Sequence, residues 1–91
     1  PEGRITPADL GLWSDAHAGP LARIARFVAS QGAVPGIQLA HAGRKASCDV
    51  PWRGGDRLGP DRGGWDVVAP SPAPFRDGDP VPRALDLDGI R

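Results

Sequence analysis

The stretch Gly36-Ile-Gln-Leu-Ala-His-Ala-Gly-Arg-Lys-Ala46 decides how the rest of the chain is interpreted. Its first six residues predict a short buried strand, over residues 36–41, that leads into a glycine-containing basic turn. Side chains alternate between the two faces of a strand. One face would carry two large aliphatic side chains and an imidazole, from Ile37, Leu39 and His41. The other face would carry Gln38 between a glycine and an alanine, which leaves room for a flat molecule beside the amide.

The composition of the 91 residues limits the class of protein. Eleven basic and 11 acidic residues give a net charge of zero, so we expect neither a nucleic-acid partner nor an acidic membrane surface. The single cysteine excludes an internal disulfide framework and is typical of a reducing cytoplasm. No apolar run approaches the roughly 18 residues of a membrane span.

An amphipathic helix is expected before the strand. Residues 1–13 carry turn formers and predict a loop, Ser14 is a good N-cap, and Gly32 is a good C′ residue. Apolar residues between them follow i, i+3, i+4, i+7 spacing, at Leu21, Ile24, Ala25 and Val28. We therefore predict a helix over residues 14–31, in which Gly19-Pro20 either introduces a kink or separates a short turn from the main helix.

After the strand the chain changes character. Residues 42–83 are rich in glycine and proline and predict a long loop, in which residues 65–69 are the one short apolar run. Apolar residues alternating with aspartates predict the start of a further helix over residues 84–91. A helix followed by a buried strand is typical of an α/β protein, but one helix and one strand cannot bury their apolar faces. We therefore expect the chain to be a piece of a larger α/β protein.

Residues 36–46 resemble the strand and turn of the Old Yellow Enzyme family, the flavin-dependent ene-reductases. The closest resemblance is to the bacterial branch of NADPH dehydrogenases and xenobiotic reductases. Three further stretches agree with this family in order: Pro1-Glu-Gly-Arg-Ile-Thr6, Asp9-Leu-Gly-Leu-Trp-Ser-Asp15 and Ala69-Pro-Ser-Pro-Ala-Pro-Phe75. Residues 47–68 fit the family pattern least well. The resemblance implies a partial TIM (β/α)8 barrel, about one to two βα units around the third strand with a long loop.

The resemblance also implies the function of the parent protein. NADPH or NADH would pass hydride to FMN, and the flavin would pass it to the activated C=C bond of an α,β-unsaturated carbonyl, a small-molecule enone. Residues 1–91 alone are expected to be inactive, because the proton donor, the carbonyl-binding pair and the phosphate site would lie outside them. The parent is expected in the cytoplasm, without nucleic-acid or membrane partners, and a homo-oligomer is compatible with this family.

Two site residues follow from the resemblance. The glutamine that matches Gln38 hydrogen-bonds the pyrimidine end of the flavin, and a carboxamide offers the donor and the acceptor that this edge requires. Lys45 matches a position that lines the substrate region. We expect no catalytic residue and no metal site in the chain, because Asp86 and Asp88 lack the further ligands of a calcium loop.

Other polar and aromatic residues are expected to be structural. The side chain of His41 would point with the aliphatic residues, away from the flavin, and Arg44 would hold the loop. Cys48 is expected to be incidental. The tryptophans are expected to anchor loops by burying their rings: Trp13, Trp52 and Trp65.

Two other interpretations remain open at this point. One is a related flavoprotein of the 2,4-dienoyl-CoA reductase type, whose iron–sulfur cysteines this chain does not supply. The other is a non-enzymatic segment whose proline-rich residues 70–74 bind partner proteins, although they contain no PxxP with a basic flank.

Overall fold

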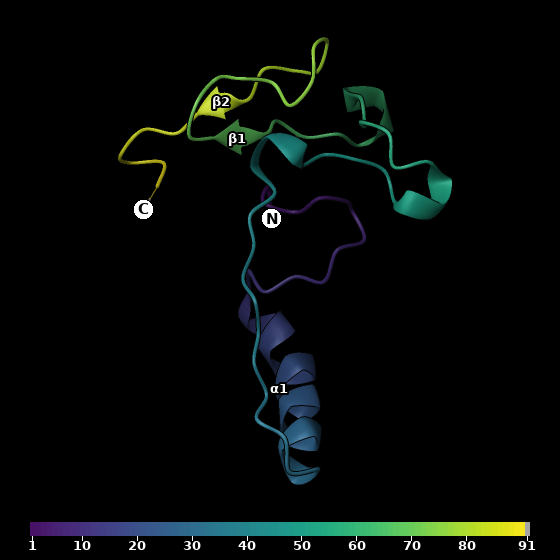
Figure 1. Cartoon of the computed structure of the whole chain (residues 1–91), viewed down its shortest axis with the longest axis vertical. Coiled ribbons are helices and arrows are strands. Elements are labelled where there is room, and N and C mark those ends of the chain that lie inside the picture. Colours follow the sequence, from purple (N-terminus) through teal and green to yellow (C-terminus); the bar gives the residue numbers. More distant parts are fainter. Residues whose placement is uncertain (91) are drawn as a thin grey trace. The chain divides into compact units, whose positions relative to one another are not determined.

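The computed structural model describes residues 1–90, which form one α-helix, three short 3₁₀ turns and two short strands (Figure 1). In chain order the elements are α1 (Asp15–Ser30), η1 (Gly43–Lys45), η2 (Pro51–Arg53), η3 (Pro60–Arg62), β1 (Val68–Ala69) and β2 (Arg83–Ala84). The chain divides into two compact units. One unit is Leu10–Ala40, and the other is Pro1–Asp9 together with the chain from His41 onward.

The first of these units consists mainly of α1, which lies where the apolar spacing predicts a helix. Its C-terminal end is closed by Gly32, whose φ of 82° only glycine adopts without strain. The N–H of Gly32 donates to the carbonyl of Ala29 (3.0 Å), and the N–H of Ala33 donates to that of Val28 (3.3 Å), which is a Schellman motif. Pro20 lies inside a continuous helix, so no separate turn precedes it.

The N-terminal end of α1 differs from the expected cap. Ser14 has the extended backbone of an N-cap residue, but its side chain caps no backbone N–H. Its hydroxyl instead lies 2.7 Å from Nδ1 of His17, whose ring stacks at a tilt on Trp13. The hydroxyl of Ser14, which the sequence predicts to cap a backbone N–H, thus contacts the imidazole of His17 instead.

The strand predicted over residues 36–41 is not formed in this structure. These residues are exposed and irregular, and none has a ladder partner among the described residues. The reason is physical: a strand exists only where a neighbouring strand accepts and donates its backbone hydrogen bonds. The α/β content that the structure does show is α1 and the parallel pair β1–β2, with Val68 opposite Arg83 and Ala69 opposite Ala84.

The buried core lies in the segment that the sequence predicted as a loop, residues 42–83. Apolar residues at or below 7 % exposure are Ala46, Val50, Leu58, Val67, Val68 and Ala69, and Pro82 is fully buried beside them. An antiparallel bridge joins Cys48 to Arg57, and the N–H of Leu58 donates to the carbonyl of Ser47 (2.8 Å). The loop is therefore folded on itself by β-type bridges and 3₁₀ turns.

The N-terminal residues belong to this second unit. The N–H of Cys48 donates to the carbonyl of Ile5 (2.8 Å), and Asp9 accepts from the hydroxyl of Thr6 (2.6 Å) and the N–H of Ile5 (2.7 Å). Burial raises the pKa of Asp9, but the hydrogen bonds from Thr6 and Ile5 lower it by more than burial raises it. The pKa of Asp9 therefore lies below its ordinary value. The loop over residues 1–13 is thus ordered at its start by its own polar side chains.

The helix predicted over residues 84–91 is not formed within the described residues. Ala84 is part of β2, and residues 87–90 make a single turn; Arg91 lies outside the described residues. The carboxylate of Asp86 accepts from the N–H of Gly89 (2.8 Å), the bond that an N-cap residue makes at a helix start. The aspartate that the periodicity placed inside a helix is used to hold the turn.

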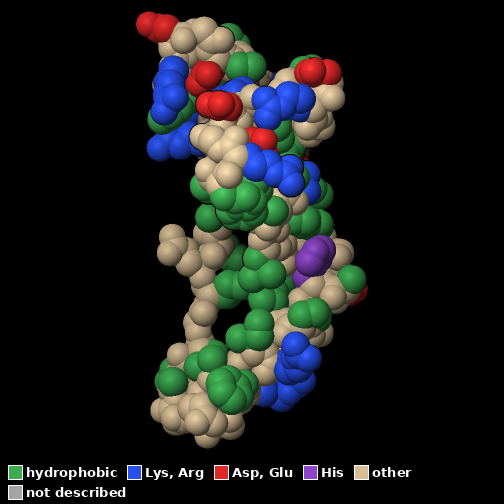
Figure 2. All heavy atoms as spheres, turned by 90° about the vertical axis from the view of Figure 1, so that its right-hand side faces the viewer, with side chains coloured by type: hydrophobic (Ala, Val, Ile, Leu, Met, Phe, Trp, Pro, Cys, Tyr) green, Lys and Arg blue, Asp and Glu red, His purple; other side chains and the backbone are tan. Residues whose placement is uncertain are grey.

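Large apolar side chains remain exposed, notably in the unit that holds α1. Figure 2 shows hydrophobic side chains open to view along this part of the chain. Ile24, Phe27, Ile37 and Leu39 are 53–74 % exposed, and Val34 is 95 % exposed. Contiguous apolar surface of this kind normally packs against further protein. In residues 1–90, none of the helices is both long and apolar enough to cross a membrane.

Candidate functional site

Lys45 lies at the end of the tight turn η1, which is formed by Gly43-Arg-Lys45. The N–H of Lys45 donates to the carbonyl of Ala42 (3.1 Å), and the N–H of Ala46 donates to that of Gly43 (3.0 Å). Gly43 has a φ of 56°, so this turn requires a residue tolerant of left-handed backbone. Because Lys45 is the last residue of the turn, its side chain is exposed.

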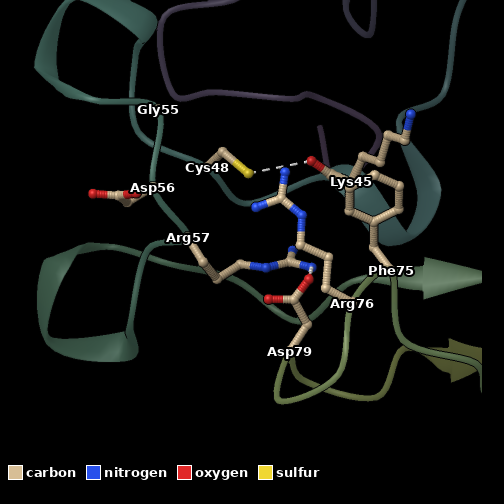
Figure 3. Close-up of a pocket in the computed structure, with 8 residues that line it drawn as sticks. All are labelled: Lys45, Cys48, Gly55, Asp56, Arg57, Phe75, Arg76 and Asp79. Carbon is tan, nitrogen blue, oxygen red and sulfur yellow. Dashed lines mark hydrogen bonds and ion pairs between the residues drawn. The ribbon is translucent and has the colours of Figure 1, made fainter.

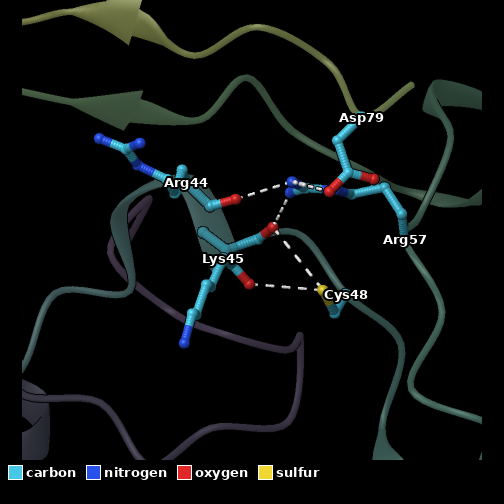
Figure 4. Close-up of polar contacts among 6 residues, drawn as sticks. Arg44, Lys45, Cys48, Arg57 and Asp79 are labelled. Atoms are coloured by element: carbon cyan, nitrogen blue, oxygen red, sulfur yellow. Dashed lines mark hydrogen bonds and ion pairs between the residues drawn. The ribbon is translucent and has the colours of Figure 1, made fainter. Parts of the chain in front are cut away.

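Arg57 fixes the backbone on both sides of Lys45 (Figure 4). Its guanidinium donates to the carbonyl of Arg44 (2.7 Å) and to the carbonyl of Ala46. The same group forms an ion pair with Asp79 (3.7 Å), and the two side chains are only 18 % and 23 % exposed. A planar guanidinium suits this task because its donors point in fixed directions. Sequence reasoning missed Arg57, since nothing in its local pattern predicts a contact 13 residues away.

A cavity of about 540 Å³ lies beside this turn. Its lining residues come from the turn, the bridge and the segment after β1: Lys45, Cys48, Gly55, Asp56, Arg57, Phe75, Arg76 and Asp79 (Figure 3). The ammonium of Lys45 lies 4.6 Å from the centroid of the Phe75 ring, and the guanidinium of Arg76 lies 5.3 Å from it. Phe75 thus positions two cations by cation–π attraction.

Gln38 lies in the other unit, where its side chain is exposed and makes no hydrogen bond among the described residues. A methyl group added at Gly36 would meet nothing within 4 Å, so the space beside the glutamine is open. The carboxamide is therefore available to an external donor and acceptor. Gln38 and Lys45 belong to different units of the chain.

His41 has the structural contacts that the sequence predicts for it. Its Nδ1 accepts from the N–H of Gly43 (3.0 Å), which places the ring proton of the neutral imidazole on Nε2. A methyl group at Gly3 would lie 2.7 Å from Cδ2 of this ring, and the carbonyl of Gly3 accepts from the N–H of Ala42 (2.8 Å). His41 therefore packs on Gly3 and supports the start of η1.

The other predicted structural residues have varied positions. Arg44 donates to the hydroxyl of Ser71 (3.2 Å) and so does hold a loop. Cys48 is a free thiol whose sulfur lies 3.4 Å from the carbonyl of Lys45. Among residues 1–90 there is no group of three or more acidic, histidine or cysteine side chains that could bind a metal.

The tryptophans do not behave alike. Trp65 anchors the N-terminal segment, because its indole N–H donates to the carbonyl of Glu2 (3.0 Å) and its ring lies 4.7 Å from the guanidinium of Arg4. Trp13 packs against His17 at a centroid distance of 4.8 Å. The expectation was wrong for Trp52, which lies in η2 and is 77 % exposed, so its ring anchors no loop by burial.

Comparison with known proteins shows that this chain is similar to parts of proteins named as oxidoreductases. A NADH:flavin oxidoreductase of Gibberella zeae is 48 % identical over 92 residues, which covers 97 % of this chain and 22 % of that protein. An NADPH dehydrogenase of Bacillus subtilis is 44 % identical over 91 residues, all of this chain and 22 % of that protein. The chain is similar along nearly its whole length to both of these proteins.

These relatives confirm the resemblance to NADPH dehydrogenases that the sequence predicts. A further NADPH dehydrogenase, from Bacillus velezensis, is 37 % identical over 91 residues, all of this chain and again 22 % of the relative. No protein-family model matches the chain. The chain spans about a fifth of the length of the curated relatives it matches.

Proposed function

We propose that residues 1–91 are part of an FMN-dependent NAD(P)H oxidoreductase that reduces the activated C=C bond of α,β-unsaturated carbonyls. The observation that carries this proposal is similarity along the whole chain to proteins named NADPH dehydrogenase and NADH:flavin oxidoreductase. The flavin, when bound, supplies the hydride chemistry. The protein supplies binding, orientation and polarisation, and those tasks are what its side chains must perform.

Gln38 is the proposed flavin contact in this chain. Its carboxamide carries a donor and an acceptor side by side, as the alternating C=O and N–H groups of a flavin pyrimidine edge require. The open space at Gly36 and the exposed, unbonded carboxamide are compatible with a ring beside this residue. Any larger side chain at position 36 or 40 would reduce that space.

Lys45 is the proposed substrate contact. An ammonium has three donors and no acceptor, which suits a carbonyl or anionic oxygen. Its position on the cavity with Phe75 gives an enone both a charged group and an apolar surface to contact.

The proposed fold of the whole protein is a TIM barrel in which residues 36–41 form a strand. Ile37 and Leu39 are exposed in this chain, and residues 36–41 lack a ladder partner among the described residues. Neighbouring strands would supply both the missing hydrogen bonds and the apolar cover. The turn after this strand would then lie at the carboxyl ends of the barrel strands, where barrel active sites are found.

The experiment uses the whole protein and residues 1–91 side by side. The whole protein should carry FMN after purification, identified after denaturation by chromatography, and should oxidise NADPH faster when 2-cyclohexenone is added. Residues 1–91 alone should do neither. A whole protein without bound flavin would contradict the proposal. A flavoprotein whose NADPH oxidation does not respond to any enone would contradict the proposed substrate class.

A further inference from the structure

We infer that the cavity beside η1 holds an anion subsite for a phosphate monoester, formed by Lys45 and Arg76 over the ring of Phe75. This inference rests on the proposed function and assigns the subsite to a phosphate group of the nicotinamide cofactor or of another phosphate-bearing ligand, which would contact Lys45 when no enone is bound. Nothing in the resemblance assigned Phe75 or Arg76 to a site.

Positive charge accumulates on the lining of the cavity. Three cationic side chains line the cavity, namely Lys45, Arg57 and Arg76. Of these three cations, only Arg57 has a carboxylate partner within residues 1–90, which is Asp79 at 3.7 Å. Two cationic groups on the cavity are thus left without a counter-charge.

The two cations without a counter-charge, Lys45 and Arg76, lie close together. Both lie on one phenyl ring, at 4.6 and 5.3 Å from its centroid, so their charges are less than about 10 Å apart. That separation is within a Debye length at about 0.1 M salt, and the two cations repel each other at this range. An anion between them would turn this repulsion into attraction.

The two carboxylates on the cavity leave Lys45 and Arg76 accessible to a ligand. In Figure 3 the carboxylate of Asp56 points away from Lys45, Phe75 and Arg76, whereas Arg76 extends into the cavity. Asp79 is held by Arg57. Neither carboxylate therefore competes with a ligand for the two free cations.

The chemistry of the pair selects a phosphate. A guanidinium can donate two parallel hydrogen bonds to phosphate oxygens, and an ammonium acts as a point charge beside it. The exposed edge of Phe75, 42 % accessible, adds an apolar surface on which a ribose or base can rest. Such a subsite would favour a cofactor with a 2′-phosphate over one without it.

The test measures binding to the whole protein by calorimetry, with probes that cannot transfer hydride. Adenosine 2′,5′-bisphosphate, 5′-AMP and inorganic phosphate are titrated into the wild type and into Arg76→Gln, Lys45→Gln and Arg53→Gln. Arg53 is the matched control, because it is exposed, lies in η2 and does not line the cavity.

We expect Arg76→Gln and Lys45→Gln each to weaken adenosine 2′,5′-bisphosphate binding about fivefold, the effect of one exposed charge pair. Binding of 5′-AMP should change little, and Arg53→Gln should match the wild type for every probe. Circular dichroism of each variant, matching the wild type, shows that a loss of binding is not a loss of folding.

The outcomes separate the two sources of phosphate. A fivefold loss confined to the bisphosphate supports the subsite and assigns it to the nicotinamide cofactor. A loss for inorganic phosphate, with no advantage of the bisphosphate over 5′-AMP, supports the subsite and assigns it to another phosphate-bearing ligand. Equal affinities of the wild type and both cavity variants for all three probes would overturn it. None of these binding results depends on NADPH oxidation. A failure of the proposed function would therefore appear in the oxidation assay and could be told apart from a failure of the subsite.

Discussion

Replacing Arg57 by glutamine should loosen the turn that presents Lys45. The wild-type guanidinium donates to the carbonyls of Arg44 and Ala46 and pairs with Asp79. A hydrogen bond from a charged donor contributes about 1.5 kcal/mol, so two of them contribute about 3 kcal/mol. The partly exposed ion pair adds about 0.5 kcal/mol. The local free energy of opening should therefore fall by about 3.5 kcal/mol in Arg57→Gln.

The assay is native-state hydrogen exchange of the η1 amides, which reports local opening free energies. The N–H groups of Lys45 and Ala46 close the turn, and their exchange should accelerate more than about 100-fold, as about 3 kcal/mol requires. The N–H groups of Gly32 and Ala33 close α1 in the other unit and serve as controls in the same sample.

A second variant separates the two contributions of Arg57. Asp79→Asn removes only the ion pair and should accelerate exchange at η1 by about threefold, since a partly exposed pair contributes little. If Arg57→Gln changed the exchange of Lys45 and Ala46 by no more than Asp79→Asn does, the two carbonyl bonds would not hold the turn, and the reasoning would be refuted.

Two further predictions concern stability. Gly64→Ala should destabilise the protein by about 3 kcal/mol, because the added methyl would overlap the carbonyl oxygen of Leu58 and lie 2.8 Å from that of Gly59. Gly63→Ala, where φ is 80° and nothing lies within 4 Å of the added methyl, should destabilise it by only about 1 kcal/mol. Similar midpoints of urea unfolding for the two variants would contradict this. Because the pKa of Asp9 is lowered in the folded state, its carboxylate stabilises the fold above the unfolded-state pKa, and this stability is lost as the pH falls through the folded-state pKa. The stability of Asp9→Asn should therefore depend less on pH below about pH 4. An acid unfolding transition unchanged from the wild type would count against the hydrogen bonds from Thr6 and Ile5.

The sequence predicted α1 well because every signal for it is local. The apolar spacing, Ser14 before the helix and Gly32 after it all lie within the helix or next to it. The C-terminal glycine was the most reliable of these signals, because the backbone at Gly32 is accessible to few other residues. Only the side-chain bond of Ser14 differed, since His17 offered its hydroxyl a competing partner.

The side-chain pattern of residues 36–41 alone could not decide whether they form a strand in this chain. Alternation of side chains fixes which residues share a face, but a strand also needs a partner, and the partner is a property of the surrounding chain. Gln38 was found from two small neighbours and a resemblance, and its role stays a prediction.

The cavity could not have been found from local pattern at all. Arg57 contacts carbonyls 11 and 13 residues earlier, and Phe75 lies 30 positions after Lys45. Glycines and prolines in residues 42–83 indicate turns but not which turns meet. One usable signal was present: a phenylalanine and an arginine at residues 75 and 76, directly after a stretch of alanine, proline and serine at residues 69–74.

The most direct test of the central claim is the affinity of the whole protein for FMN when Gln38 is replaced by alanine. One hydrogen-bonding group contributes about 1 to 1.5 kcal/mol, so the dissociation constant should rise about tenfold in Gln38→Ala. Gln31→Ala, which removes a carboxamide at the end of α1, is the matched control and should bind FMN as the wild type does. Wild-type affinity in Gln38→Ala would contradict the account that residues 36–46 form a wall of a flavin site.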